Sequence, residues 1–149
     1  MVERFESFTL NIMNIYRYWN EIATREMDKY GFKGVSGLYL LILNWAKEGM
    51  TAANLAKTCG RDKAEVSRSI SAFRKNGWLC NNEEKYRSLL KLSEQGKMIA
   101  SEIEKRALLA LEQAHQGMSE DKLLAMQECL QELSKRLRIM AVEGIAASK

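Results

Sequence analysis

The residues of this chain that could carry out binding chemistry are the cations of its central segment, residues 51–92. That segment holds nine basic residues against four acidic ones, a net charge of +5, while the whole chain of 149 residues has a net charge of only +4. Lysine and arginine gathered in one segment are typical of proteins that bind the phosphates of nucleic acid. The alternative is a solvated basic surface without a partner.

The spacing of apolar residues within this segment predicts a helix, and it distinguishes the side chains that can reach DNA from those that face the core. Val66, Ile70 and Phe73 have the i, i+4, i+7 spacing of a buried helix face. Advancing about 100° per residue from Val66 turns a second set of side chains outward. The outward set is Ala64, Ser67, Arg68, Ser71 and Lys75. These residues are expected to face a groove of DNA, with the two serines short enough for a close approach.

Arg68 is the strongest candidate for reading a base, because its guanidinium can engage both acceptors on the edge of a guanine. Its alternative role is an exposed ion pair with Glu65. Lys63 and Lys75, at the two ends of the same helix, are interpreted as phosphate contacts, which position a protein without reading sequence. Glu65 is also expected to complete a capping box with Asp62 at the start of this helix.

The chain contains no proline, whereas average usage would give roughly seven, and this favours a mainly helical protein. Apolar periodicity, capping residues and glycines predict helices over residues 6–29, 36–47, 52–59, 62–76 and 93–116 and from residue 120 onward. The expected N-caps are Ser36, Thr51, Asp62, Ser93 and Ser119, and Gly60 is the expected C-terminal glycine. Residues 78–80 and 87–92 alternate as two strands of a small β-hairpin would, around the polar tip 81–86.

The first and the last predicted helix each carry an apolar stripe that repeats every 3.5 residues. The stripe positions that we assign to dimerisation are Phe5, Phe8, Ile12 and Ile15 in the first helix and Leu123, Leu130, Leu133 and Leu137 in the last. Two such stripes can pack against a second copy of the chain. The alternative is that they pack against each other within one chain.

A short helix, a turn at Gly60-Arg61, a second helix and a hairpin follow one another in the order of a winged helix-turn-helix. The residues within this order resemble the MarR family (multiple antibiotic resistance regulators), and they are Leu55-Ala56, Asp62-Lys63, Val66-Ser67-Arg68, Gly77-Trp78-Leu79 and Leu90-Lys91-Leu92-Ser93 with Gly96. The resemblance covers essentially the whole chain. It implies one domain, in which residues 1–33 and 93–149 form dimerisation helices and residues 34–92 form a winged-helix lobe. It also implies a homodimeric transcription regulator, a repressor, that binds pseudo-palindromic double-stranded DNA.

In this family the wing also contacts DNA, so the resemblance adds Lys85 and Arg87 to the expected DNA-binding residues. Here the sequence departs from the family, whose wing is longer and carries an Asp-x-Arg signature. The corresponding run is Glu84-Lys85-Tyr86-Arg87, in which Tyr86 takes the place of the arginine. Insertion of this wing into the minor groove is therefore the least supported of the expected contacts.

Many members of the family bind a small aromatic effector in a cleft between the dimerisation helices and the DNA-binding lobe. The aromatic residues on the helices that would line such a cleft are Tyr16, Trp19, Tyr39 and Trp45. Aromatic residues at helical spacing are also typical of an ordinary core, which is their alternative role.

Other classes of function find no support in the sequence. The three cysteines and the single histidine, His115, lack metal-ligand spacing, and there is no phosphate-binding glycine loop or nucleophile elbow. We therefore expect no metal, no cofactor and no enzyme, with His115 on the surface and Cys80 either a small buried hydrophobe or a redox-sensitive thiol. The absence of a signal peptide and of a long apolar run predicts a cytoplasmic protein without a membrane partner. Two alternatives remain: a winged-helix module for protein–protein interaction and a ligand-sequestering protein without operator specificity.

Overall fold

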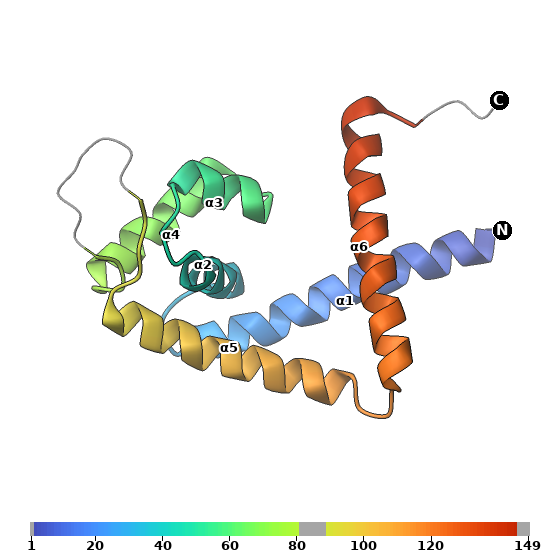
Figure 1. Cartoon of the computed structure of the whole chain (residues 1–149), viewed down its shortest axis with the longest axis horizontal. Helices are drawn as coiled ribbons and strands as arrows, with labels where there is room; N and C mark the ends of the chain where they lie inside the picture. Colours follow the sequence, from blue (N-terminus) through green and yellow to red (C-terminus); the bar gives the residue numbers. More distant parts are fainter. Residues whose placement is uncertain (1, 81–88, 146–149) are drawn as a thin grey trace. The chain divides into compact units, whose positions relative to one another are not determined.

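The computed structural model describes residues 2–80 and 89–145, and it is mainly helical, as the sequence predicts. The helices are α1 (Val2–Asp28), α2 (Gly34–Trp45), α3 (Ala52–Cys59), α4 (Lys63–Lys75), α5 (Glu94–Ala114) and α6 (Glu120–Glu143) (Figure 1). Two compact units divide the chain, residues 1–108 and residues 109–149. The first unit contains the helix-turn-helix and its core, and the second is built around α6. None of the described helices has both the length and the apolarity that crossing a membrane requires.

The helix-turn-helix formed by α3 and α4 begins and ends where its capping residues predict. The Thr51 hydroxyl accepts a hydrogen bond from the backbone N–H of Asn54 at 3.1 Å, which starts α3. Gly60 ends this helix in the left-handed conformation, at φ 59°, a backbone geometry that glycine adopts without strain. The Asp62 carboxylate then accepts from the backbone N–H of Ala64 at 2.9 Å and starts α4. The expected roles of these three residues are confirmed.

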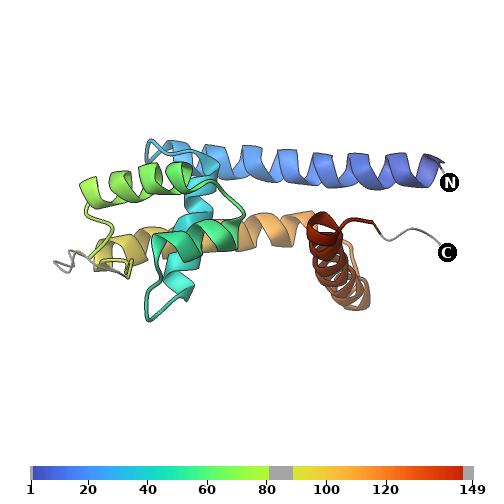
Figure 2. The same ribbon diagram turned by 90° about the horizontal axis from the view of Figure 1, so that it is seen from above.

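The core of the first unit holds α4 in place through the face that the sequence predicts. Val66, Ile70 and Phe73 are buried. Around them lie the other large buried side chains, which come from α1, α2, α3 and the segments that flank the hairpin: Met27, Tyr39, Leu40, Leu43, Leu55, Trp78, Leu79, Leu90 and Leu92. In both views α3 and α4 lie close to α2, while the amino-terminal half of α1 extends away from them (Figures 1 and 2). Since one face of α4 is locked into the core, its other faces are fixed in direction.

The start of α2 differs from the prediction that Ser36 is its N-cap. The helix begins at Gly34, and its N-cap is Lys33, three residues before the predicted cap. A Cβ at Gly34 would lie 2.7 Å from the backbone nitrogen of Thr24, so only glycine allows α2 to approach α1 this closely. Ser36 is buried within the first turn of α2, with its hydroxyl 3.4 Å from that of Ser69 in α4. The prediction failed because it used the capping preference of serine and not this helix contact.

The base of the hairpin is paired as expected, and it gains a third partner that the sequence did not predict. Leu79 and Leu92 form an antiparallel bridge. Met50, which directly precedes α3, forms a second bridge with Leu90, with backbone N···O distances of 3.2 and 2.7 Å. A single paired residue leaves no alternating pattern in a sequence, so this pairing had no signal. Within residues 2–80 and 89–145 the sheet consists of these isolated bridges, and the hairpin tip lies outside the described residues.

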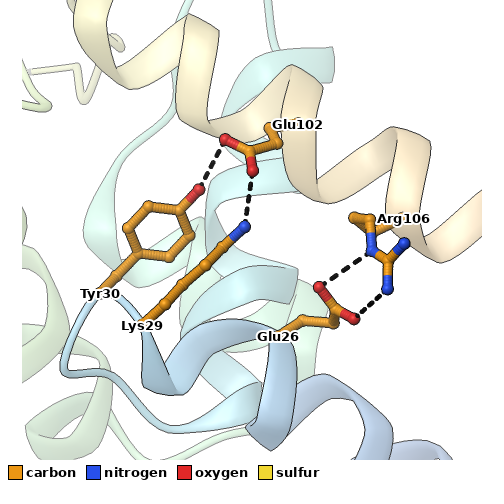
Figure 3. A network of polar contacts seen from close by, with 5 residues as sticks. All are labelled: Glu26, Lys29, Tyr30, Glu102 and Arg106. Carbon is orange, nitrogen blue, oxygen red and sulfur yellow. Dashed lines mark hydrogen bonds and ion pairs between the residues drawn. The ribbon is translucent and has the colours of Figure 1, made fainter.

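Polar contacts attach α5 to the carboxyl-terminal end of α1 (Figure 3). Glu26 receives two hydrogen bonds from the Arg106 guanidinium, at 2.8 and 3.1 Å. The Glu102 carboxylate accepts from Lys29 at 2.6 Å and from the Tyr30 hydroxyl at 2.8 Å. These hydrogen bonds, from Arg106 and from Lys29 respectively, lower the pKa of Glu26 and that of Glu102. The pairs fix the direction of α5 relative to α1 inside the first unit.

The amino-terminal caps of α5 and α6 follow the predicted positions with one difference. The Ser93 hydroxyl accepts from the backbone N–H of Gly96 at 3.1 Å, which confirms it as the cap of α5. The same hydroxyl donates to the carbonyl of Gly77 at 2.6 Å and so ties α5 to the end of α4. Ser119 occupies the N-cap position of α6 but makes no capping hydrogen bond through its side chain.

Candidate nucleic-acid interface

The outward face of α4 carries the side chains that the helical period assigns to DNA. Val66, Ile70 and Phe73 are at most 4% exposed. All the expected contacts on this helix are exposed, namely Lys63, Ala64, Ser67, Arg68, Ser71 and Lys75. Two wing residues that we also expect to bind DNA, Lys85 and Arg87, lie outside the described residues, as does Tyr86. The structure thus brings together two lysines, an arginine and two serines on one rigid helix.

Arg68 is available for a ligand. Among the residues that the structure describes, no ion pair or hydrogen bond involves its guanidinium, so the alternative pairing with Glu65 is not present. Glu65 instead accepts a hydrogen bond from the Tyr39 hydroxyl at 3.4 Å. The capping-box prediction for Glu65 is therefore wrong, because Tyr39, buried in α2, offers its carboxylate another donor.

A cavity of about 710 Å³, which no pattern in the sequence predicts, lies beside α4. One wall is α4 itself, and the opposite wall is the segment between α1 and α2 together with the first turn of α2. Three cations line the cavity, Lys33, Arg68 and Lys75, against the single carboxylate of Glu65. An excess of positive charge at a concave surface favours an anionic ligand. We refer to this cavity as the α4 groove.

Arg61, one of the central cations, does not point to the surface that α4 presents. Its guanidinium donates to the Tyr16 hydroxyl of α1 at 2.6 Å, and the residue is half-buried. This hydrogen bond raises the pKa of Arg61, while hydrogen bonds with Asn20 and Arg61 lower the pKa of Tyr16. The turn of the helix-turn-helix is in this way attached to α1. The charge count of the central segment included Arg61 among the cations that could bind DNA. In the structure, however, its guanidinium is hydrogen-bonded to Tyr16.

The four aromatic residues considered for an effector cleft do not share one environment. Tyr39 is 0% exposed and belongs to the core, where burial raises its pKa to about 12. The other three are exposed, and two of them have polar partners in the first unit. Tyr16 binds Arg61, and the Trp45 indole N–H donates to Glu104 of α5 at 2.9 Å. Tyr16, Trp19 and Trp45 are thus the members of the set with surface for a ligand.

The predicted dimerisation stripes are open in the isolated chain. In the first unit, Phe8, Ile12 and Ile15 of α1 are exposed, Ile15 to 68%. The side chain of Phe5 lies outside the described part of the chain. In the second unit, Leu130, Leu133 and Leu137 are exposed, Leu123 is half-buried, and α6 has no buried residue. Apolar stripes of this length without a cover are typical of a protein interface.

The cysteines and the histidine occupy positions that differ partly from expectation. Cys80 is exposed, so its interpretation as a buried hydrophobe is wrong, because its thiol is turned to the carbonyl of Leu92, at 3.3 Å, and not into the core. His115 is half-buried in the turn that follows α5. Over residues 2–80 and 89–145 there is no group of three or more side chains with metal-ligating chemistry.

Several solved structures that resemble this chain are transcription regulators. A MarR-family regulator from Listeria monocytogenes, complexed with a 26mer DNA, superposes with a TM-score of 0.78 at 20% identity, over 95% of this chain and 97% of the other. A MarR regulator from Methanosarcina mazei Go1 gives 0.78 at 19% identity, over 91% and 99%. CouR from Rhodococcus jostii RHA1, bound to p-coumaroyl-CoA, gives 0.73 at 15% identity, over 85% and 90%. No family model and no curated protein sequence matches this chain. The predicted resemblance is confirmed at the level of the fold, which is that of MarR-family regulators.

Proposed function

We propose that this chain is a homodimeric, sequence-specific DNA-binding transcription regulator of the MarR family. The observation that carries the proposal is the exposed, unpaired Arg68 on α4, whose opposite face is fixed in the core. The fold is shared with a regulator that was crystallised with DNA. A surface that merely keeps a protein soluble does not require this combination of a rigid helix, an unpaired arginine and flanking lysines.

In the proposed complex α4 lies in the major groove. Arg68 binds the edge of a guanine through both of its terminal nitrogens, and Ser67 and Ser71 approach bases or backbone. Lys63 and Lys75 bind phosphates and set the register. Lys85 and Arg87 of the wing border the minor groove, where the negative potential attracts cations.

Two copies of the chain join through the apolar stripes of α1 and α6 and place two α4 helices in successive major grooves, about one helical turn apart. The regulator acts as a repressor when this dimer occupies a promoter. A small aromatic effector that binds more tightly to the dimer at one separation of its two α4 helices than at another changes the affinity of the dimer for DNA. The ligand in the CouR structure supports an effector of this kind, and Tyr16, Trp19 and Trp45 are the candidates to contact it.

The test is the selection of binding sites by the purified protein from a random duplex library at about 0.15 M salt. At this salt the Debye length is about 8 Å, which weakens nonspecific electrostatic attraction. We expect enrichment of a palindrome with half-sites about one helical turn apart. A reporter gene behind that palindrome then separates repression from activation. Absence of enrichment, together with a flat salt dependence of duplex binding, would favour the alternative of a protein–protein interaction module.

A further inference from the structure

The two flanks of α4 differ in charge. The flanks are the two sides of α4 that lie between its outward face and its buried face. One flank carries Lys63 and Arg74, which are both exposed. The other flank carries Glu65, Ala72 and Asn76, which line the α4 groove. Arg68 and Lys75, on the outward face between the two flanks, also border this groove, but the flank itself carries no cation of α4.

This asymmetry matters because a helix in the major groove has a phosphate strand on each side. The groove is about 12 Å wide and an α-helix with its side chains is about 10–12 Å across, so both strands lie close to the flanks. On the flank without cations, the strand would meet the carboxylate of Glu65 and the neutral side chains of Ala72 and Asn76. Besides Arg68 and Lys75, which border the groove from α4, a cation in the opposite wall would bring further positive charge to this strand.

Lys33 is that cation. It lies in the opposite wall of the α4 groove, it is exposed, and no carboxylate pairs with it among the described residues. It is also the N-cap of α2, so the positive end of the dipole of that helix adds to its potential. Its chemistry therefore matches an anion that passes along the mouth of the groove.

The wall that carries Lys33 is fixed to α4. The Phe32 ring packs on Phe73 of α4 and on Trp78, with ring centroids 5.3 and 4.9 Å apart. The hydroxyls of Ser36 and Ser69 lie 3.4 Å apart and tie the first turn of α2 to α4. The backbone of Lys33 is thus set relative to Arg68 before any ligand arrives, which reduces the ordering cost of a contact.

We propose that Lys33 binds a phosphate of the DNA strand that runs along the α4 groove, so that the segment between α1 and α2 is a second DNA-binding element. The proposal rests on the proposed function. It assigns the groove to the sugar–phosphate backbone and not to a small molecule. It also gives α1, a predicted dimerisation helix, a neighbour that touches the DNA.

The experiment compares the salt dependence of binding to the selected duplex for the unmodified protein, Lys33→Gln, Lys33→Arg and the control Lys105→Gln. Lys105 is an exposed lysine of α5 outside the α4 groove, and its replacement removes the same charge. Each lost phosphate contact lowers the slope of log K against log salt by about 0.9, so a dimer with two contacts should lose about 1.8. At 0.1 M salt the Lys33→Gln variant should bind roughly ten- to sixtyfold more weakly, with an unchanged sequence preference. Lys33→Arg and Lys105→Gln should retain the slope.

The outcomes separate the two proposals. Salt-dependent duplex binding with the same slope in the unmodified protein and in Lys33→Gln would overturn the role of Lys33 and leave the proposed function standing. An equal loss of slope in Lys33→Gln and Lys105→Gln would also overturn it, because general charge would then explain the effect. Absence of duplex binding by the unmodified protein would overturn the proposed function and this inference with it. Circular dichroism of each variant verifies that the fold is retained.

Discussion

Arg68 and Lys75 share one exposed face of α4, but their side chains are suited to different acceptors on DNA. The planar guanidinium of Arg68 matches the pair of acceptors on a guanine, whereas the ammonium group of Lys75 is a point charge that any phosphate satisfies. Both side chains also border the α4 groove. Substitutions of these two residues can therefore distinguish contacts to bases from contacts to the DNA backbone on a single helix.

Replacing Arg68 and Lys75 one at a time should reveal that distinction. Arg68→Ala should weaken binding to the selected palindrome by about 1 to 3 kcal/mol and relax the preference at one base position, while binding to random duplex changes less. Lys75→Ala should weaken both duplexes alike. Fluorescence anisotropy titrations with the two duplexes measure the difference. Equal losses on both duplexes for both variants would contradict the assignment of Arg68.

Tyr39 gives the fold a dependence on alkaline pH. Its folded pKa of about 12 lies above its ordinary value of 10 because the buried phenol resists ionisation. The neutral phenol therefore contributes stability that is complete below pH 10, and this stability is lost as the pH rises from 10 through 12. In urea titrations the unmodified protein should lose about 1 to 3 kcal/mol more than Tyr39→Phe across that window. Parallel losses in the two proteins would show that Tyr39 ionises freely.

The elements of the helix-turn-helix could be predicted from the sequence because their signals are local. The bounds of α3 and α4 depend on Thr51, Gly60 and Asp62, and each of these residues acts on its own backbone or within three residues. The bridge between Met50 and Leu90 and the buried position of Ser36 depend on partners far away in the chain. No period in a sequence reports such contacts, so these two features were missed.

The same distinction explains which site residues were found. The period of α4 shows which of its side chains are outward, and that was enough to place Arg68 and Lys75. The direction of Arg61 toward Tyr16 and the position of Lys33 across the α4 groove arise from the packing of α1 and α2 against the helix-turn-helix. Charge in a sequence identifies a cation, but only the tertiary structure identifies its partner.

The lack of a side chain at Gly96 allows α5 to pack closely against the base of the hairpin. A Cβ at this position would collide with the carbonyl oxygen of Trp78, which is backbone and cannot turn aside. Gly96→Ala should therefore lower the free energy of unfolding by about 1 to 3 kcal/mol, in the range of overpacked sites. The control is Gly37→Ala in α2, whose Cβ would meet the flexible side chain of Met27 at 3.1 Å. Urea unfolding measures both, and an equal or larger loss in Gly37→Ala would contradict the role of the backbone collision.

At the scale of the whole molecule, the proposed binding of an operator depends on the apolar stripes of α1 and α6. A monomer would leave these stripes in water, at a cost of about 25 cal/mol for each Å² that a partner could bury. The proposed dimer would cover them and bind two half-sites at once, and the second contact would then form at a high effective concentration. In the proposed dimer the stripes would thus link the stability of the assembly to its affinity for a palindrome.

Charges placed in the stripe of α6 should break this link. The double variant Leu130→Asp/Leu137→Asp should sediment as a monomer and bind the palindrome about 10² to 10⁴ times more weakly, while its affinity for a single half-site is retained. Leu124→Asp is the matched control, because Leu124 is also exposed on α6, at 54%, but lies outside the stripe. This control should remain a dimer with full affinity. If analytical ultracentrifugation finds the unmodified protein monomeric at micromolar concentration, or if the double variant is still dimeric, the stripes have another partner. A monomeric unmodified protein would have to read the palindrome without the cooperation of two chains, whereas a dimeric double variant would show that the dimer forms through another surface.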